Sequence, residues 1–457
     1  MRETTPQAYS VSGVVVGTRV VEFNGVPLRI AMIDSKRLAL IASRLRGAFA
    51  LRQMPLADVV DALGETARRW QSPSFAFRQV AEEYLPKLTG YSRPVIARGL
   101  DHLFNELSRD NLWALLEEEF GDPLVLDTWR PRRRARGKVR AFGPPLSLHV
   151  IAGNIPGIGV QSLIFGLLVK SPSIVKTASD EPLLTALFAQ SLHEVAPALA
   201  QNAAVMWWAG EETVWLPVEV TDVVMAYGSN ETIEVYRKML PAGCRFVNYG
   251  HRYSIALIAR EYATEKTARL LAIDMAMYDQ QGCLSPHQCW VEEGGALSPQ
   301  AFAESLADAL DAIEADLPSY RAPHKRMKSF ITKHIQEVRT VCEMSGGTVY
   351  KSAQGAIWTV LFHPTVIAQL PALFRGILVS SVSNLEELPH LESPDALQAI
   401  GIAAPPERAP TIMDAYAAAT GVNRFCPIGK MQFPPLLWHH DGRPNLTDLV
   451  RWVDWEE

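Results

Sequence analysis

One thiol lies in the stretch Tyr278-Asp279-Gln280-Gln281-Gly282-Cys283-Leu284-Ser285-Pro286, between a helical pattern over 264–277 and a strand pattern over 288–291. Proline cannot continue a helix, so Pro286 separates the two elements. A cysteine attacks only as the thiolate, which forms where backbone amides or positive charge lower the pKa of the thiol. A loop between a helix and a strand exposes such amides. Cys283 is therefore our candidate nucleophile, and the alternative is a small packed side chain.

Strand and helix patterns alternate on the N-terminal side of this loop. The predicted strands cover 146–152, 173–176, 203–207 and 220–227, and the predicted helices cover 160–169, 183–195 and 231–240, with a short helix or turn at 211–216. Strands that alternate with helices of this size predict βαβ units on a parallel sheet. The predicted fold class is therefore α/β.

A second α/β block surrounds the Cys283 loop, and other patterns precede both blocks. The second block adds strands over 254–258, 348–350, 358–362 and 377–382, and helices over 299–315 and 323–334. Within 9–33, β-rich runs on either side of Asn24-Gly25 predict a small antiparallel sheet or hairpin pair. Residues 35–119 carry the apolar periodicity of helices.

Whole-chain composition limits the class of protein. The 457 residues allow two or three domains, and 48% hydrophobic with 20% charged residues is typical of a globular protein. A formal net charge of −5 gives no reason to expect a nucleic-acid partner. The five cysteines lack paired short spacings, which predicts reduced thiols, no disulfide framework and no metal site. Without an apolar signal core or an apolar run near the ~20 residues of a membrane span, we expect a cytoplasmic protein.

Another segment, Ala152-Gly153-Asn154-Ile155-Pro156-Gly157, directly follows a predicted strand. Ligands of open parallel sheets bind at the carboxyl ends of the strands. The Asn154 amide donates hydrogen bonds without carrying charge, which suits a developing oxyanion. The alternative role for Asn154 is a turn cap beside glycine and proline.

Two further strand ends carry groups suited to a nucleotide. Lys176 closes the strand over 173–176, and small hydroxyl residues follow it; the alternative is a lysine that faces solvent. Gly228 and Ser229 join the strand over 220–227 to a helix. The N-terminal amides of such a helix bind phosphate, and a plain helix cap is the alternative.

The order and spacing of these four segments resemble the aldehyde dehydrogenase superfamily, in which an oxyanion Asn, a cofactor Lys, a Gly-Ser turn and a nucleophilic Cys follow one another. Lys176 lies 22 residues after Asn154, Gly228 lies 52 residues after Lys176, and Cys283 lies 55 residues after Gly228. More narrowly, the chain resembles the LuxC-type fatty acyl-CoA reductases over roughly residues 100 to 430. The segments that carry this resemblance are Asp279-Gln280-Gln281-Gly282-Cys283-Leu284-Ser285-Pro286, Asn154-Ile155-Pro156-Gly157, Ala226-Tyr227-Gly228-Ser229, Tyr249-Gly250-His251 and Val422-Asn423-Arg424-Phe425-Cys426-Pro427-Ile428-Gly429.

The resemblance implies an aldehyde-dehydrogenase-like fold with three parts. Residues 1–128 and 148–249 would form a Rossmann-type domain that binds a nicotinamide cofactor. Residues 250–425 would form the catalytic domain that carries the Cys nucleophile. Residues 129–147 and 426–457 would form a small oligomerisation flap, in which the Arg-rich segment joins a C-terminal strand. A homo-oligomer is therefore expected.

One departure from ordinary aldehyde dehydrogenases concerns water. Those enzymes carry a Glu that activates water to hydrolyse the acyl-enzyme, and Asn248 stands at that position in Phe246-Val247-Asn248-Tyr249-Gly250-His251. An amide is not a general base near neutral pH. The acyl-cysteine should therefore survive water and exchange with a thiol or accept hydride, which fits a coenzyme A-linked reductase. His251 and His287 flank this region as proton donors, ligand contacts or ordinary hydrogen-bonded residues.

A second departure concerns the cofactor. Members that prefer NAD often place a Glu three residues after the Lys, where it holds the ribose 2′-hydroxyl, and Ser179 stands at that position here. A Glu would repel a 2′-phosphate, whereas Ser179 and Lys176 could both bind one. NADPH is therefore favoured over NADH. An inward-turned side chain of Asp180 or Glu181 would oppose this preference.

Two polar segments lie outside this constellation. The run from Thr128 to Arg140 is the densest positive stretch of the chain. It is interpreted either as a solvated connection or sheet edge, or as a contact for the phosphates of a ligand. The segment His439-His440-Asp441-Gly442 is interpreted as a polar turn rather than a metal cluster, because no third partner lies at ligand spacing.

The resemblance implies the NADPH-dependent reduction of an acyl-CoA to the aldehyde through a thioacyl-Cys283 intermediate. Asn154 and the Cys283 backbone N–H would hold the oxyanion, and Lys176 with the Gly228-Ser229 turn would hold the cofactor phosphates. Coenzyme A would be the leaving group, and the family implies an acyl-protein synthetase as a partner. Two alternatives stay open: a CoA-acylating, NAD-dependent aldehyde dehydrogenase, and a Cys-dependent acyltransferase without hydride transfer.

Overall fold

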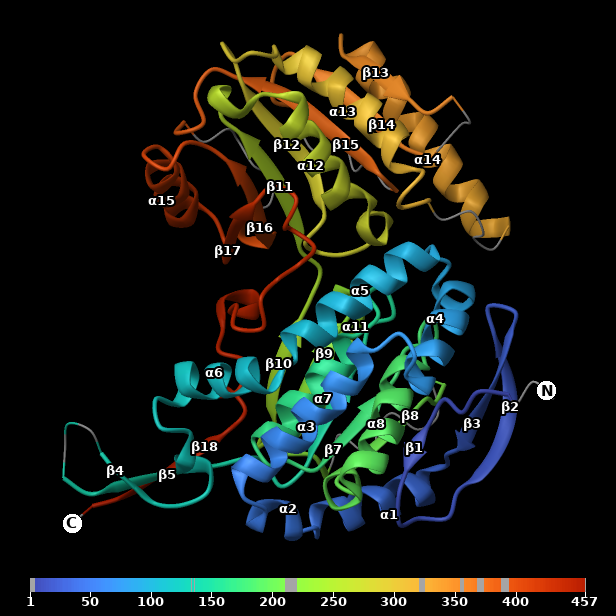
Figure 1. Ribbon diagram of the computed structural model, residues 1–457, viewed down its shortest axis with the longest axis vertical. Coiled ribbons are helices and arrows are strands. Elements are labelled where there is room, and N and C mark those ends of the chain that lie inside the picture. Colours follow the sequence, from blue (N-terminus) through green and yellow to red (C-terminus); the bar gives the residue numbers. More distant parts are fainter. Residues whose placement is uncertain are drawn as a thin grey trace.

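Figure 1 shows the computed structural model of the chain as two α/β lobes with a small sheet that extends from the lower lobe. The structure describes residues 5–132, 134, 136–209, 220–319, 325–353, 357–367, 374–387 and 394–456, without the side chains of 325–331. The lower lobe holds a six-stranded sheet and the upper lobe a seven-stranded sheet. The C-terminal segment leaves the upper lobe and runs along the lower lobe to the small sheet.

The lower lobe is built on the sheet β1-β8-β7-β6-β9-β10. Its strands are β1 (Ser10–Val11), β8 (Ala203–Met206), β7 (Ser173–Lys176), β6 (Ser147–Val150), β9 (Val223–Tyr227) and β10 (Arg245–Tyr249). All neighbours are parallel except β1 and β8. The strands predicted over 146–152, 173–176, 203–207 and 220–227 are confirmed. Strand β10 was not predicted, because it is an edge strand of five residues whose polar and apolar side chains mix.

Helices cover both faces of this sheet. They are α1 (Ser35–Arg46), α2 (Ala50–Gln53), α3 (Leu56–Gln71), α4 (Ala76–Thr89), α5 (Arg93–Glu106), α6 (Arg109–Phe120), α7 (Ile158–Leu168), α8 (Leu184–Val195), α9 (Pro197–Ala200) and α11 (Asn230–Met239). The largest core joins one sheet face to α3, α5, α7 and α8, and a second core joins the other face to α1 and α11. Helix α7 is apolar on all sides because it lies between the sheet and α3. The helices predicted over 35–119, 160–169, 183–195 and 231–240 are confirmed, and the short element at 211–216 lies outside the described residues.

The upper lobe is built on the sheet β13-β14-β15-β12-β11-β16-β17. Its strands are β13 (Thr348–Lys351), β14 (Thr359–His363), β15 (Gly376–Val382), β12 (Pro286–Glu292), β11 (Tyr253–Ile258), β16 (Leu397–Ala403) and β17 (Arg424–Pro427). Only the β13–β14 pair is antiparallel. Helices α12 (Glu265–Ala276) and α13 (Pro299–Ile313) cover one face, α15 (Ala409–Ala419) packs on the other, and α14 (Lys325–Met344) flanks β13 and β14. Strands β16 and β17 and helix α15 were not predicted, and the helix predicted over 323–334 is shorter than α14.

Two small antiparallel sheets complete the fold. Strands β2 (Gly17–Phe23) and β3 (Val26–Met32) form the predicted hairpin, whose turn residues Asn24 and Gly25 have φ angles of 49° and 79°. Strand β5 (Lys138–Phe142) lies between β4 (Arg130–Pro131) and β18 (Arg451–Trp455). The Arg-rich segment therefore pairs with a C-terminal strand as the resemblance implies. That this sheet joins subunits, and the boundaries of the three parts, stay predictions.

Two charges of the Arg-rich run are paired with carboxylates of the same chain. Arg130 Nε lies 2.7 Å from an Asp122 oxygen, and Arg132 pairs with Asp454. These pairs favour the interpretation as a solvated edge over a phosphate contact. No helix within the described part of the chain is long and apolar enough to cross a membrane.

Candidate functional site

Three of the four candidate segments meet at the carboxyl edge of the six-stranded sheet. Strands β7, β6 and β9 are parallel neighbours, so Lys176 ends one strand, while Asn154 and Gly228 lie in the loops after the other two. The chain moves away from β6 first towards β8 and later towards β10. Such a reversal opens a crevice between neighbouring strand ends, where ligands of open α/β sheets bind.

Lys176 is a partly buried cation at this edge. Its Nζ lies 5.5 Å from the centroid of the Trp208 ring, and burial lowers the pKa of the ammonium. No ion pair within the described ranges involves Lys176, although the other buried cations of this lobe, Arg78 and Lys170, pair with carboxylates. An ammonium in that position can bind hydroxyl or phosphate oxygens of a ligand.

The Gly228-Ser229 turn caps the N-terminus of α11. The Ser229 hydroxyl accepts a hydrogen bond of 3.3 Å from the Thr232 backbone N–H, and the Gly228 N–H donates to the Tyr249 carbonyl at 3.2 Å. Ser229 is exposed, and the Glu231 carboxylate lies at the same helix start, where hydrogen bonds from the Ser229 hydroxyl and from the Glu231 backbone N–H lower its pKa. The helix cap is confirmed, and the binding of a phosphate at this turn stays a prediction.

Ser179 and Glu181 occupy the loop after β7. The exposed Ser179 hydroxyl accepts a 3.1 Å hydrogen bond from Trp207 Nε1 and can still donate its own proton. Glu181 turns inward, and its carboxylate accepts hydrogen bonds of 2.8 and 2.7 Å from the Leu183 and Leu184 amides. Burial raises the pKa of Glu181 to about 7. Asp180 stays exposed. Glu181 thus caps the start of α8, and its inward turn is the arrangement that opposes the NADPH preference. The role of Ser179 in choosing NADPH stays a prediction.

Asn154 connects the sheet edge to the Cys283 loop. Its side-chain Nδ2 donates a 2.8 Å hydrogen bond to the carbonyl of Gln281, and its own carbonyl accepts a 2.6 Å hydrogen bond from the Tyr91 hydroxyl. Only one of the two Nδ2 hydrogens is used within the described residues. The structure therefore brings Asn154 next to the loop that carries Cys283, although 129 positions separate the two residues.

The backbone before Cys283 has an uncommon conformation. Tyr278, Asp279 and Gln280 have φ angles of 53°, 47° and 60°, which non-glycine residues rarely adopt. Buried contacts hold this turn: Asp279 pairs with Arg375 at 2.7 Å, and Gln280 Oε1 accepts a 2.6 Å hydrogen bond from Gly376 N–H. Such strain persists only where surrounding contacts enforce it.

The Cys283 thiol is less acidic than a free thiol, contrary to the low pKa that the sequence analysis associates with such a loop. Burial raises the pKa of Cys283 to about 12; the Asp441 carboxylate also raises it, while Arg252 and Arg424 oppose these effects only in part. The side chain remains partly accessible from the adjoining cavity. Cys283 therefore rests as a thiol, and its attack on a carbonyl requires a proton acceptor.

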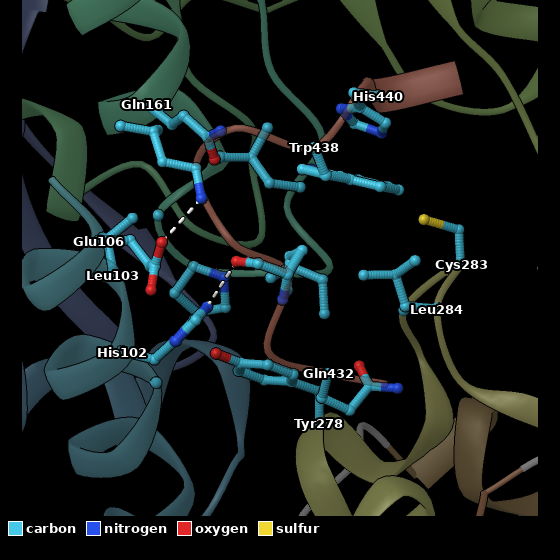
Figure 2. A pocket seen from close by; sticks show the side chains of 18 of the residues that line it. His102, Leu103, Glu106, Gln161, Tyr278, Cys283, Leu284, Gln432, Trp438 and His440 are labelled. Carbon is cyan, nitrogen blue, oxygen red and sulfur yellow. Dashed lines mark hydrogen bonds between the residues drawn. The ribbon is translucent and has the colours of Figure 1, made fainter. Parts of the chain in front are cut away.

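A cavity of about 130 Å³ adjoins Cys283. Helix α5, residues 155–161, the Cys283 loop and residues 432–440 line it. In Figure 2 the sulfur of Cys283 points towards Trp438 and His440, while His102 and Glu106 lie on the opposite side. Side chains such as those of Leu103 and Leu284 make much of the lining apolar, which suits an acyl chain.

Helix α5 and residues 432–440 line the site, which the sequence patterns do not predict. The His102 ring lies 3.0 Å from the Pro434 carbonyl, and Glu106 accepts a 2.7 Å hydrogen bond from the Leu436 N–H. These contacts join residues more than 300 positions apart, and no local pattern predicts them. The sequence patterns also do not predict the close approach of α5 to Tyr278. A Cβ on Gly99 would lie 2.2 Å from the Tyr278 hydroxyl.

Asn248 lies in β10, where its carbonyl accepts a 2.5 Å hydrogen bond from Arg443. Val247 and Tyr249 belong to the largest core, so strand alternation puts the Asn248 side chain on the opposite face, which carries α11. The exposed His251 donates its backbone N–H to the Asn230 side chain at 3.1 Å. Neither His251 nor His287 lines the cavity beside Cys283.

Solved structures with the same fold include aldehyde dehydrogenases. The NADP-dependent glyceraldehyde-3-phosphate dehydrogenase from Bacillus halodurans C-125 gives a TM-score of 0.77 at 13% identity, covering 99% of each chain. Aldehyde dehydrogenase 21 from Physcomitrella patens gives a TM-score of 0.74 at 14% identity, covering 99% of this chain and 98% of that one. These similarities show an aldehyde-dehydrogenase-like fold, which confirms the predicted fold class.

Sequence relatives narrow the family. The long-chain acyl-protein thioester reductase of Aliivibrio fischeri is 26% identical over 88% of this chain and 82% of its own length. The protein of the same name from Vibrio harveyi is 24% identical over 89% and 84%. The family described as acyl-CoA reductase (LuxC) matches residues 51–452, a wider range than the 100 to 430 over which the motifs suggest it. The chain therefore belongs to the LuxC family of acyl-CoA reductases.

Proposed function

We propose that the protein reduces an acyl-CoA to the aldehyde with NADPH, through a thioester between the acyl group and Cys283. The observation that carries this proposal is the 2.8 Å hydrogen bond from Asn154 to the Gln281 carbonyl, which keeps an uncharged amide donor beside the thiol. Asn154 and Cys283 lie next to an apolar cavity and the carboxyl edge of a parallel sheet. A nucleophile, an oxyanion donor and a nucleotide-type crevice together suit acyl transfer followed by reduction.

Asn154 and the Cys283 backbone N–H would stabilise the tetrahedral oxyanion that forms when the sulfur attacks the thioester carbonyl. The second hydrogen of the Asn154 amide is free for this purpose among the described contacts. The Ser254 hydroxyl donates a 2.7 Å hydrogen bond to the Cys283 carbonyl and fixes the backbone at the nucleophile. Such preorganised donors lower the barrier because they need not reorient as charge develops.

The sheet edge fits a dinucleotide. Lys176 forms no ion pair among the described residues, and the Gly228-Ser229 turn starts helix α11 at the same sheet edge, where a phosphate would displace the Glu231 carboxylate from the helix N-terminus. When bound there, a reduced nicotinamide supplies the hydride that turns the thioester into an aldehyde. Ser179 supports the choice of NADPH, since its hydroxyl can donate to a 2′-phosphate. Accordingly, Ser179→Glu should weaken NADPH binding and leave NADH binding intact.

Asn248 supports reduction over hydrolysis. The resemblance puts a water-activating carboxylate at this position of β10, whereas an amide does not accept a proton near neutral pH, and Asn248 is not among the residues that line the cavity. The acyl-cysteine therefore persists until it reacts with hydride or with a second thiol. The relatives named above are acyl-protein thioester reductases, so an acylated protein, such as the synthetase that the resemblance implies, is the alternative donor of the acyl group for this chain.

The test compares wild type with Cys283→Ala, on acyl-CoAs of several chain lengths and on an acylated carrier protein. Cys244→Ala serves as the matched control, because Cys244 is a partly exposed thiol outside the cavity. We expect NADPH oxidation and aldehyde formation that only the Cys283 variant abolishes, with an acyl adduct on Cys283 in the mass spectrum. An adduct without NADPH oxidation would replace the reductase with an acyltransferase. Preferential CoA-dependent aldehyde oxidation with NAD would favour the oxidative enzyme, and absence of both adduct and turnover would reject the proposal.

A further inference from the structure

Acyl transfer to Cys283 requires a group that takes the thiol proton and returns it to the departing thiol. The thiol is the resting form of Cys283, and Asn248 cannot accept its proton. Four titratable side chains besides Cys283 line the described cavity: His102, Glu106, Tyr278 and His440.

The first three have other contacts. The His102 ring lies 3.0 Å from the Pro434 carbonyl, and Glu106 accepts the Leu436 N–H at 2.7 Å, both on the side of the cavity away from the sulfur. The Tyr278 hydroxyl packs against Gly99, and burial raises its pKa far above neutrality. None of the three is poised to exchange a proton with Cys283.

His440 has a different environment. Its ring stacks between Tyr249, at a centroid distance of 4.3 Å, and Trp438, at 4.8 Å. No hydrogen bond among the described residues engages its ring nitrogens, and its nearest charged contact is Asp441, 3.8 Å from Nε2. By contrast, both ring nitrogens of His149 and His363 are hydrogen-bonded. A stacked imidazole with unengaged nitrogens, facing a cavity, is oriented but free to exchange a proton.

We propose that His440 is the proton carrier for Cys283, an inference that rests on the acyl-cysteine chemistry proposed above. The His440 nitrogen accepts the S–H proton as the Cys283 sulfur bonds to the acyl carbon. The bond from that carbon to the departing sulfur then breaks, and the imidazolium returns the proton to the departing thiolate. Each transfer consumes one thiol and releases one, so no net proton is gained or lost.

The charges around His440 support this role. Tyr249, Tyr227 and Trp438 surround the ring with uncharged aromatic groups, while Asp441, Arg443 and Arg252 are the nearby charges. Burial lowers the pKa of His440 to about 4, against the opposing effect of Asp441. His440 is therefore neutral, and able to accept a proton, from about pH 5 upwards. Arg252 lies 3.2 Å from Asp441 and neutralises the carboxylate beside the ring.

The experiment measures single-turnover acylation of Cys283 by an acyl-CoA, without NADPH, in wild type, His440→Phe, His440→Ala and His102→Ala. Phenylalanine keeps the stacking between Tyr249 and Trp438 but has no nitrogen. We expect acylation to fall by about a hundred- to ten-thousand-fold in both His440 variants at pH 7, and by much less in His102→Ala. Added imidazole should restore His440→Ala and leave His440→Phe inactive, because only the alanine variant leaves room for it.

The pH profile separates proton transfer from structural support. Wild-type acylation should be constant above about pH 5, whereas acylation of the His440 variants should rise about tenfold per pH unit as hydroxide generates the thiolate. Near-normal acylation in His440→Phe would show that only stacking matters and would overturn the inference. If wild-type Cys283 is not acylated at all, the proposed function fails instead, so the two failures are distinct.

Discussion

The Cys283 loop and the carboxyl edge of the six-stranded sheet differ in how far the protein satisfies its own polar groups. In the loop, Asp279 pairs with Arg375, and the Cys283 carbonyl accepts the Ser254 hydroxyl. At the sheet edge, Lys176 has no ion-pair partner in the described chain, and Ser229 is exposed at a helix start. The first region is arranged before any ligand arrives, and the second is completed by its ligand. Substitutions in the loop should therefore affect stability and acylation, and substitutions at the edge should affect cofactor affinity.

Arg375→Gln tests the prearranged side of this comparison most severely. The Arg375 and Asp279 side chains are 1% and 4% exposed, and Arg375 also lies 2.6 Å from Glu314. Removing the cation takes the Arg375 charge away from two carboxylates, which typically costs about 3–5 kcal/mol of unfolding free energy. Denaturant unfolding measures this loss. The control is Arg109→Gln, because the Arg109–Asp61 pair is exposed and should contribute less than about 1 kcal/mol. Equal losses in both variants would contradict the prediction.

Asn154→Ala tests the link between the two regions. We expect Cys283 acylation to slow by about a hundred- to a thousand-fold, because the oxyanion loses one of two donors. The variant should keep its NADPH affinity, measured by quenching of tryptophan fluorescence. Asn111→Ala, in α6 outside the cavity, is the control for loss of a backbone-bonded amide. A loss of acylation below tenfold would show that the oxyanion lies elsewhere.

The sequence predicts the sheet edge better than the cavity. Each βα unit is local, so the patterns place Asn154, Lys176 and Gly228 at strand ends, and parallel pairing then brings them together. The cavity depends on α5 and residues 432–440, which meet only through tertiary contacts such as that between His102 and Pro434. No hydrophobic periodicity or sequence motif predicts such a tertiary contact.

His440 and the Cys283 loop show the same limit at single residues. The segment 439–442 is a short 3-10 turn in the structure, as its polar composition predicts. The stacking of His440 on Tyr249 depends on β10, which the sequence analysis missed. Likewise, the left-handed turn before Cys283 requires Arg375, 96 positions later in the chain. The thiol pKa follows from burial and Asp441 rather than from the loop alone.

Glu181→Gln tests a buried group of the sheet edge through pH. Its folded pKa of about 7 exceeds the ordinary value of 4.5, so its contribution to stability is complete below pH 4.5 and is lost as pH rises through 7. The loss reaches about 3 kcal/mol for a shift of this size. The glutamine variant should lose this part of the pH dependence, measured by unfolding between pH 4.5 and 8. Burial also raises the pKa of Asp274, in the upper lobe, to about 7, so this residue should keep its own contribution to the pH dependence of stability in the glutamine variant. An unchanged profile in Glu181→Gln would contradict the assignment.

Lys176→Met tests the ligand-completed side. The methionine keeps the length of the buried stem beside Trp208 and removes only the ammonium, so the fold and Cys283 acylation should not change. A charge-assisted hydrogen bond contributes about 1.5–3 kcal/mol, so the dissociation constant of NADPH should rise by about ten- to a hundred-fold. Fluorescence quenching gives this constant directly, and acylation without NADPH gives the other half of the comparison. Slower acylation with unchanged NADPH affinity would assign Lys176 to the Cys283 loop. Weaker NADPH binding with unchanged acylation would show that the two regions can be altered independently. The Cys283 loop is held by protein contacts, whereas the sheet edge is completed by its ligand.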